Sequence, residues 1–203
     1  MFDAALRRLI DPPLGRAGRR LAAAGWTANA MTGAGLAAGL ISAALIALGL
    51  EALALIPFAA RCLADGLDGA IARAADRKTA LGGYLDISAD FLFYGAVPLG
   101  FVLADPSGRG AAGAFLLASF YFNGATFLGY AVLAERRGLQ TSAQGEKTLY
   151  YSNGLLEGGE TLAFFTLIIL FPPIFAPMAW AFGLACFLTG TLRLVAAARR
   201  FRG

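Results

Sequence analysis

Four aspartates lie close together in a stretch of sequence that is otherwise largely apolar, and they are Asp65, Asp68, Asp86 and Asp90. At about 100° per residue of an α-helix, Asp65 and Asp68 lie roughly 60° apart on one helix face. Asp86 and Asp90 lie about 40° apart on a second helix. Placing a carboxylate on a membrane helix costs free energy, so such a residue is by default a candidate for a functional site. Four of them on two adjacent helices predict a shared ligand, most simply a divalent metal.

The chemistry of these side chains indicates which metal they would bind. The chain contains no histidine, and ligand sets made only of oxygen suit a hard cation such as Mg²⁺ or Mn²⁺. Four carboxylates carry more charge than one Mg²⁺ usually needs, so a site with two ions about 3.5–4 Å apart fits better. Such a site holds a pyrophosphate group. The alternative is a buried ion-pair network with Arg61 and Arg73, but two arginines cannot neutralise four carboxylates.

The amino-acid composition indicates what kind of structure surrounds the four aspartates. The chain has 203 residues, of which 58% are hydrophobic and 15% are charged, far more apolar than an ordinary soluble domain. The absence of histidine also excludes Ser-His-Asp catalysis and zinc sites that use histidine. Cys62 and Cys186 lie far apart in apolar stretches and are expected to be buried thiols, with no indication of an oxidising compartment.

Long apolar stretches predict an all-α fold, a polytopic membrane bundle of six transmembrane helices in one membrane-embedded domain over residues 1–203. An arginine-rich N-terminal segment, 1–25, precedes them as an amphipathic juxtamembrane helix or a basic flank. The second span cannot face lipid where it carries Asp65 and Asp68, so it must line a cavity. Asn123 and Thr126 are expected to form hydrogen bonds between helices. The spans are expected at about 27–50, 52–73, 81–104, 110–134, 154–171 and 178–195.

The distribution of basic residues predicts the orientation. With six spans, all of the 17 lysines and arginines except Arg61 and Arg109 fall on the side of the termini. By the positive-inside rule, this side is cytosolic. The sequence therefore predicts an integral membrane protein, placed in a bacterial inner membrane, with its termini and the aspartates at the cytosolic face. A substrate reaching this site would be membrane-soluble at one end, as a lipid diphosphate is.

The aspartate-bearing stretch resembles the signature of the CDP-alcohol phosphotransferase family, D-x-x-D-G-x-x-A-R, then eight residues, then G-x-x-x-D-x-x-x-D. The resemblance implies a membrane enzyme of phospholipid synthesis. It would transfer a phosphatidyl group from CDP-diacylglycerol to an alcohol and release CMP, and it would work as a homodimer. The fixed positions of the signature are filled here by Asp65, Asp68, Gly69, Ala72, Arg73, Gly82, Asp86 and Asp90.

The resemblance also assigns roles to individual residues. Asp65, Asp68 and Asp86 would hold metal and the donor diphosphate, while Asp90 would be both a metal ligand and the general base. Gly69, Arg73 and Thr79 would contact the CDP-lipid. The segment 26–32 is similar to the threonine-proline-asparagine entry of the family, with Ala28 replacing the proline. It makes Asn29 and Thr32 candidate nucleotide contacts, with a helix cap as the alternative.

The alcohol acceptor is open at this stage. A phosphorylated acceptor, such as glycerol 3-phosphate or inositol phosphate, needs a basic pocket, for which Arg61, Lys147 and Arg193 are candidates; inositol itself is the other choice. Arg61 fits an ion pair with Asp65 as well, because the two lie one helical turn apart. Glu157 and Glu160 either repel a phosphate and suit a polyol or amine, or pair with basic residues.

A different class of protein also places acidic residues within the membrane, namely ion-coupled transporters and cation channels. Their polar sites usually lie near the bilayer midplane between repeated halves. The four aspartates here lie at one edge and belong to one helix hairpin, which favours the enzyme. Release of CMP from CDP-diacylglycerol, against uptake of Mg²⁺ or Mn²⁺ into liposomes, distinguishes the two.

Overall fold

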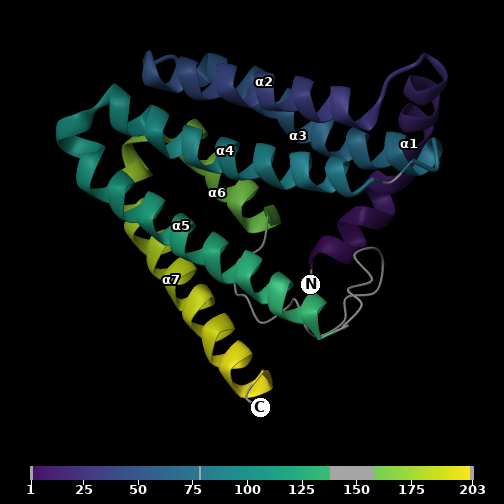
Figure 1. The fold of residues 1–203 in the computed structure, drawn as a ribbon. Helices are drawn as coiled ribbons and strands as arrows, with labels where there is room; N and C mark the ends of the chain where they lie inside the picture. Colours follow the sequence, from purple (N-terminus) through teal and green to yellow (C-terminus); the bar gives the residue numbers. More distant parts are fainter. Residues whose placement is uncertain (1, 78, 138–157, 202–203) are drawn as a thin grey trace. The chain divides into compact units, whose positions relative to one another are not determined.

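A computed structural model describes residues 2–77, 79–137 and 158–201, and every regular element in these ranges is a helix (Figure 1). The prediction of an all-α fold is confirmed. The helices form two compact units, residues 1–104 and 105–203. The elements are α1 (Phe2–Ala23), α2 (Ala28–Ala47), α3 (Glu51–Ala74), α4 (Ala80–Ala104), α5 (Pro106–Arg136), α6 (Gly158–Leu170), a 3₁₀ turn η1 (Pro172–Ile174) and α7 (Phe175–Arg200).

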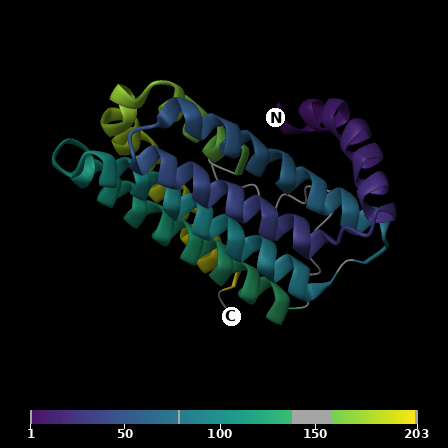
Figure 2. The same cartoon turned by 90° about the horizontal axis from the view of Figure 1, so that it is seen from above.

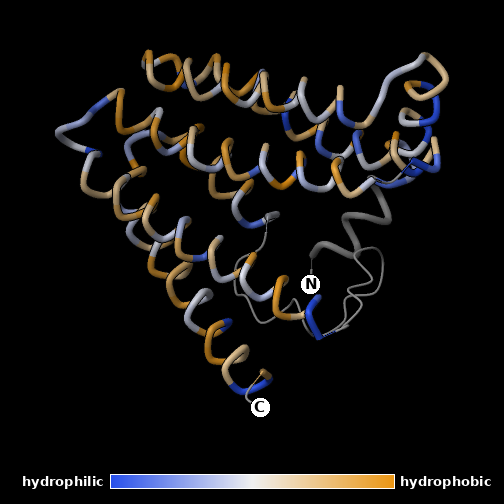
Figure 3. Tube along the Cα trace, in the orientation of Figure 1, coloured by the Kyte–Doolittle hydropathy of each residue, from blue (hydrophilic) through white to orange (hydrophobic). Residues whose placement is uncertain are grey.

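Four helices in the described ranges are long and apolar enough to cross a membrane: Ala28–Ala47, Ala80–Ala104, Pro106–Arg136 and Pro172–Arg200. In Figure 3 the hydrophobic colours cover most of these helices, while hydrophilic residues of the first unit gather where α1 lies beside α3. The expected spans 52–73 and 154–171 correspond to α3 and α6. Charged side chains interrupt α3, and α6 has 13 described residues, so a count of six spans stays a prediction.

Two threonines begin the helices that carry the site. The Thr27 hydroxyl accepts the Ala30 N–H at 3.1 Å and begins α2, and the Thr79 hydroxyl accepts the Gly82 N–H at 3.0 Å before α4. Each bond satisfies a backbone donor that has no partner within the helix. The left-handed backbone of Gly49, with φ +73°, turns the chain from α2 into α3.

Helix α2 packs against both α3 and α4, and the three helices lie side by side in both views (Figures 1 and 2). Small residues allow this close contact. A Cβ atom added at Gly35 would lie 2.9 Å from the Ala64 Cβ of α3, and one added at Gly39 would lie 2.6 Å from the Phe93 ring of α4. The G-x-x-x-G step of α2 is therefore filled by helices of the same chain.

The N-terminal helix lies across α3, close to the first two aspartates. A Cβ atom added at Gly18 would lie 2.8 Å from the backbone carbonyl carbon of Ala70, and the Leu14 side chain lies over Gly66. The side chains of three arginines of α1, Arg16, Arg19 and Arg20, are exposed. The expected N-terminal helix is confirmed, with a basic side away from its contact with α3.

The second unit is built on contact between α5 and α7, and aromatic rings fill its core. The Phe164 and Phe182 rings stack at 4.2 Å between centroids. Arg193 of α7 donates to the Asn123 side-chain oxygen at 2.9 Å and to the Thr126 hydroxyl at 3.0 Å. The expected helix-to-helix role of Asn123 and Thr126 is confirmed. At the start of α5, the Asp105 carboxylate accepts bonds from Gly108 N–H and Ser107, which lowers the pKa of Asp105.

We expect Gly100→Ala to lower the free energy of unfolding by about 1–3 kcal/mol, because overpacked contacts force helices apart. A Cβ atom at Gly100 would lie 2.6 Å from the Ala43 backbone oxygen of α2, which no side-chain rotation relieves. Thermal unfolding in detergent measures the effect. Gly95→Ala in the same helix is the matched control, since a Cβ there meets nothing within 4 Å. Equal unfolding temperatures for both variants would contradict the close packing of α2 on α4.

Candidate metal centre

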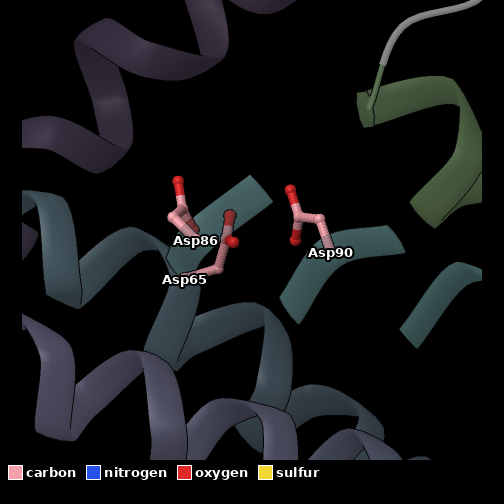
Figure 4. Close-up of side chains that lie close together, drawn as sticks. All are labelled: Asp65, Asp86 and Asp90. Atoms are coloured by element: carbon pink, nitrogen blue, oxygen red, sulfur yellow. The ribbon is translucent and has the colours of Figure 1, made fainter. Parts of the chain in front are cut away.

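Three aspartates from two helices meet at one point. Asp65 of α3 and Asp86 and Asp90 of α4 each offer one carboxylate oxygen, and these oxygens lie within 4.8 Å of one another. Figure 4 shows the three side chains pointing toward one another. All three are partly exposed, so a ligand can reach them. The sequence-based prediction that two helices bring carboxylates together is correct for these three.

The fourth aspartate is held differently. Asp68 is one helical turn beyond Asp65, with 8% of its surface exposed, and accepts a hydrogen bond of 2.7 Å from the Thr32 hydroxyl of α2. The same hydroxyl lies 3.1 Å from the Ala28 backbone oxygen. A hydroxyl has a single proton, and a carboxylate is a stronger acceptor than a backbone oxygen. The Thr32 hydroxyl therefore donates its hydrogen bond to Asp68. Nothing in the sequence alone signalled this bond.

Arg61 lies between the two helices that carry the aspartates. Its Nη1 donates to the Asp65 Oδ1 at 2.9 Å, and its Nη2 pairs with the Asp90 Oδ1. The guanidinium lies 5.2 Å from the centre of the Phe93 ring, and the residue is 5% exposed. The ion pair that the sequence allowed with Asp65 is confirmed. The sequence offered a pair with Asp90 only as part of the alternative ion-pair network. A contact between Arg61 and the acceptor stays a prediction.

The residues proposed to contact the CDP-lipid gather at the same end of the first unit. A single Cβ atom added at Gly82 would lie 3.1 Å from the Thr79 hydroxyl and 3.2 Å from the Asn29 side-chain oxygen. These three residues are therefore neighbours. A Cβ atom added at Gly69 would lie 3.2 Å from the Arg73 Nη1, so the glycine makes room for that guanidinium. These neighbourhoods suit nucleotide contacts, which remain predictions.

The acceptor candidates are spread along the chain. Arg193 lies in the second unit, where its Nη1 also donates to the Asn123 backbone oxygen at 3.0 Å and its guanidinium lies 5.6 Å from the centre of the Phe127 ring. Glu160 is exposed in the first turn of α6. Lys147 and Glu157 fall outside the described residues.

The donor set fits the metal that the sequence predicted. Asp65, Asp86 and Asp90 offer only carboxylate oxygens, and Asp68 adds another on the adjacent turn. Mg²⁺ and Mn²⁺ prefer such ligands, whereas zinc is bound chiefly by sulfur and nitrogen. The close approach of several negative charges without a cation is unfavourable. The site therefore has the composition of a centre for hard divalent cations.

A sequence model described as CDP-alcohol phosphatidyltransferase matches residues 26–196. The chain belongs to this family. The match includes the four aspartates and extends across both compact units. Among curated relatives of this phosphatidyltransferase-family chain is the inner membrane protein YnjF of Escherichia coli K12, 46% identical over 132 residues. The matched part covers 65% of this chain and 64% of the relative's length.

Solved structures of Mycobacterium tuberculosis phosphatidylinositol phosphate synthase share the fold of this family member. One, with CDP-DAG bound, has a TM-score of 0.66 at 21% identity and covers 91% of this chain and 93% of its own. Another, in complex with manganese and citrate, has a TM-score of 0.66 at 23% identity and covers 90% of this chain and 87% of its own. At these identities the likeness establishes the fold alone.

Proposed function

We propose that this protein transfers a phosphatidyl group from CDP-diacylglycerol to an alcohol and releases CMP. The observation that carries the proposal is the meeting of Asp65, Asp86 and Asp90, from the two halves of the family signature, within 4.8 Å. The structural neighbours support the donor and the metal, because one has CDP-DAG bound and another contains manganese. Two Mg²⁺ or Mn²⁺ ions, held by Asp65, Asp68, Asp86 and Asp90, fit this chemistry best.

Each side chain has a defined task in this proposal. Bound divalent ions would neutralise the donor diphosphate and polarise the bond that breaks. Asp90 takes the proton from the acceptor hydroxyl as that oxygen attacks phosphorus, and CMP leaves with the electrons of the broken phosphorus–oxygen bond. Arg73 pairs with a donor phosphate, since its guanidinium is exposed beside Gly69. Asn29, Thr32 and Thr79 complete the donor site.

The membrane setting follows from the same proposal. Six spans would place α3 and α6 in the bilayer with the four long apolar helices, in a single domain of residues 1–203. The termini and the aspartates would then face the cytosol of a bacterium, by the positive-inside rule. The relative named an inner membrane protein supports this placement. A homodimer is also proposed, on the ground of family membership alone.

The proposed acceptor is glycerol 3-phosphate, or inositol or its phosphate. The structural neighbour that makes phosphatidylinositol phosphate favours a phosphorylated polyol. Arg193 of α7 offers a cation held in place by Asn123 of α5, and Lys147 and Arg61 are the other candidates. None of these residues identifies the acceptor, so the substrates have to be tested separately.

The deciding experiment measures CMP release. Purified protein in detergent receives CDP-diacylglycerol and Mg²⁺ or Mn²⁺, with glycerol 3-phosphate, inositol, inositol phosphate, serine or choline offered one at a time. Release with one acceptor establishes the reaction and names the product lipid. Failure with every acceptor, together with failure to bind CDP-diacylglycerol and with uptake of Mn²⁺ into liposomes, would favour the ion transporter instead.

We expect Thr32→Val to reduce kcat/KM about 10-fold to 100-fold, because loss of a hydrogen bond that orients a metal ligand has effects of this size. Valine keeps the shape of threonine but cannot donate to the Asp68 Oδ2. Steady-state CMP release measures the change, and Thr32→Ser, which retains the hydroxyl, should restore most of the activity. If the Thr32→Val variant were as active as the wild type, the Thr32 hydroxyl would have no part in the site.

A further inference from the structure

Arg61 occupies an unusual position for an arginine. It is 5% exposed, on the apolar half of a helix, and its Nε–H has no hydrogen-bond partner among the described residues. Burial of a charge is costly unless it is compensated, and here Asp65 and Asp90 supply the compensation. The one task that the proposed reaction gives Arg61 is a candidate contact with the acceptor, and this contact does not account for the two ion pairs with aspartates.

The surroundings of Arg61 fix its position. The Phe93 ring lies 5.2 Å from the guanidinium carbon, and a Cβ atom added at Gly35 would lie 3.6 Å from the Arg61 Cδ. α2, α3 and α4 thus all contact this side chain. Among the described residues, α3 and α4 approach each other much less closely than either approaches α2. Arg61 therefore joins α3 and α4 through its side chain, as does the contact between the Phe58 and Phe93 rings, whose centroids lie 6.0 Å apart.

The hydrogen bonds of Arg61 involve only one oxygen of each carboxylate. It bonds one oxygen of Asp65 and one oxygen of Asp90, the Oδ1 in each case, so the Oδ2 of each remains for another partner. A planar guanidinium with two parallel donors fixes the planes of the groups that it binds, which a single ammonium does not. Orientation of metal ligands by a neighbouring shell of hydrogen bonds is a general way of tuning metal affinity.

We propose that Arg61 is a positioning residue that holds Asp65 of α3 and Asp90 of α4, one oxygen each, so that their other oxygens converge on a divalent cation. This inference rests on the proposed function, because it assigns the cation to that site. The inference also predicts the direction in which the Arg61 side chain changes the affinity of the site for the cation. Pure repulsion between Arg61 and the cation would weaken binding, whereas orientation by both nitrogens strengthens it.

The test compares Arg61→Lys with Arg61→Met by direct Mn²⁺ titration, monitored by electron paramagnetic resonance in detergent. We expect Mn²⁺ affinity to fall about 10-fold to 100-fold in both variants, because methionine bonds neither carboxylate and a lysine ammonium does not fix the planes of the carboxylates that it bonds. Arg16→Met, which removes an exposed charge from α1, is the matched control and should bind Mn²⁺ as the wild type does. The metal-free unfolding temperature should fall in both Arg61 variants.

Other outcomes overturn the inference in distinct ways. Tighter Mn²⁺ binding by Arg61→Met, with wild-type affinity in Arg61→Lys, would show that the charge only competes with the cation. Unchanged affinity with a raised KM for a phosphorylated acceptor would make Arg61 an acceptor contact. If Arg61→Met does not fold, Arg61→Lys decides alone, since wild-type affinity there contradicts the inference. Wild-type protein that binds no Mn²⁺ would instead contradict the proposed metal site.

Enzyme kinetics provide a second readout. In the positioning role, Arg61→Lys should raise the Mn²⁺ concentration needed for half-maximal CMP release by the same factor as it weakens Mn²⁺ binding. Saturating Mn²⁺ should then recover most of kcat. A variant whose kcat stays low at saturating metal, with normal metal dependence, would place Arg61 in direct contact with the reacting groups and overturn its role as a positioning residue.

Discussion

Asp90→Asn should reduce the rate of CMP release at least about 1,000-fold. General base catalysis alone contributes about 10²–10⁴-fold, and the substitution also removes a charged metal ligand. The amide keeps nearly the same shape, so the helices should still pack. Arg61 loses one of its two ionic partners in this variant. Release of CMP under saturating metal and donor is the measurement.

The matched control for this variant is Asp105→Asn. Asp105 caps α5 by accepting the Gly108 N–H, and asparagine is an equally good cap, so activity should remain at the wild-type level. A wild-type rate in Asp90→Asn would remove Asp90 from the role of base. A low rate together with wild-type Mn²⁺ affinity would separate its role in proton transfer from its role as a ligand.

Removal of divalent metal should abolish CMP release, and addition of Mg²⁺ or Mn²⁺ should restore it. The reason is that Asp65, Asp86 and Asp90 bring negative charge within 4.8 Å, where the donor diphosphate would add more. Assay after treatment with a chelator and dialysis gives the baseline, and stepwise return of each cation gives the dependence. Zn²⁺ should restore far less activity, because it prefers nitrogen and sulfur ligands.

Protein stability provides an independent check on the metal. A cation that binds only the folded state raises the unfolding temperature as its concentration increases. We expect Mn²⁺ to stabilise the wild type and to stabilise Asp86→Asn much less, because Asp86 is one of the three converging ligands. Full activity in chelator, or equal stabilisation of both proteins, would contradict a metal-dependent reaction at this site.

The sequence predicted the helices well because their signals are local. Apolar stretches and helix periodicity located α2 to α7 within a few residues at most ends, and the spacing of Asp86 and Asp90 placed both on one face of α4. The two-unit division of the helices was not foreseen, because it depends on contacts between helices distant in the sequence. In the part of the chain that the structure describes, four helices are long and apolar enough to cross a membrane, and α3 with its charged residues is not among them.

The site was only partly predictable, for a similar reason. The four aspartates could be identified because carboxylates are unusual in apolar sequence, and the family motif predicts that they form one site. The hydrogen bond from Thr32 to Asp68 joins two residues that lie 36 positions apart, on consecutive helices, so no periodicity reveals it. Arg61 could be paired with Asp65 from its spacing, whereas its contact with Asp90 needs the approach of α4.

Two of the three glycines of α2, Gly35 and Gly39, bear on the expected order of assembly. Gly35 receives α3, the next helix to be made, but Gly39 receives Phe93, which is synthesised only after the whole of α3. Since chains are made and inserted from the N-terminus, we expect the pair α2–α3 to form before α4 packs against Gly39. The first unit therefore closes late, when α4 arrives, and the same event brings Asp86 and Asp90 to Asp65. Closure of the first unit and assembly of the candidate metal site would then be one step, and the second unit, with α5 to α7, is synthesised after α4.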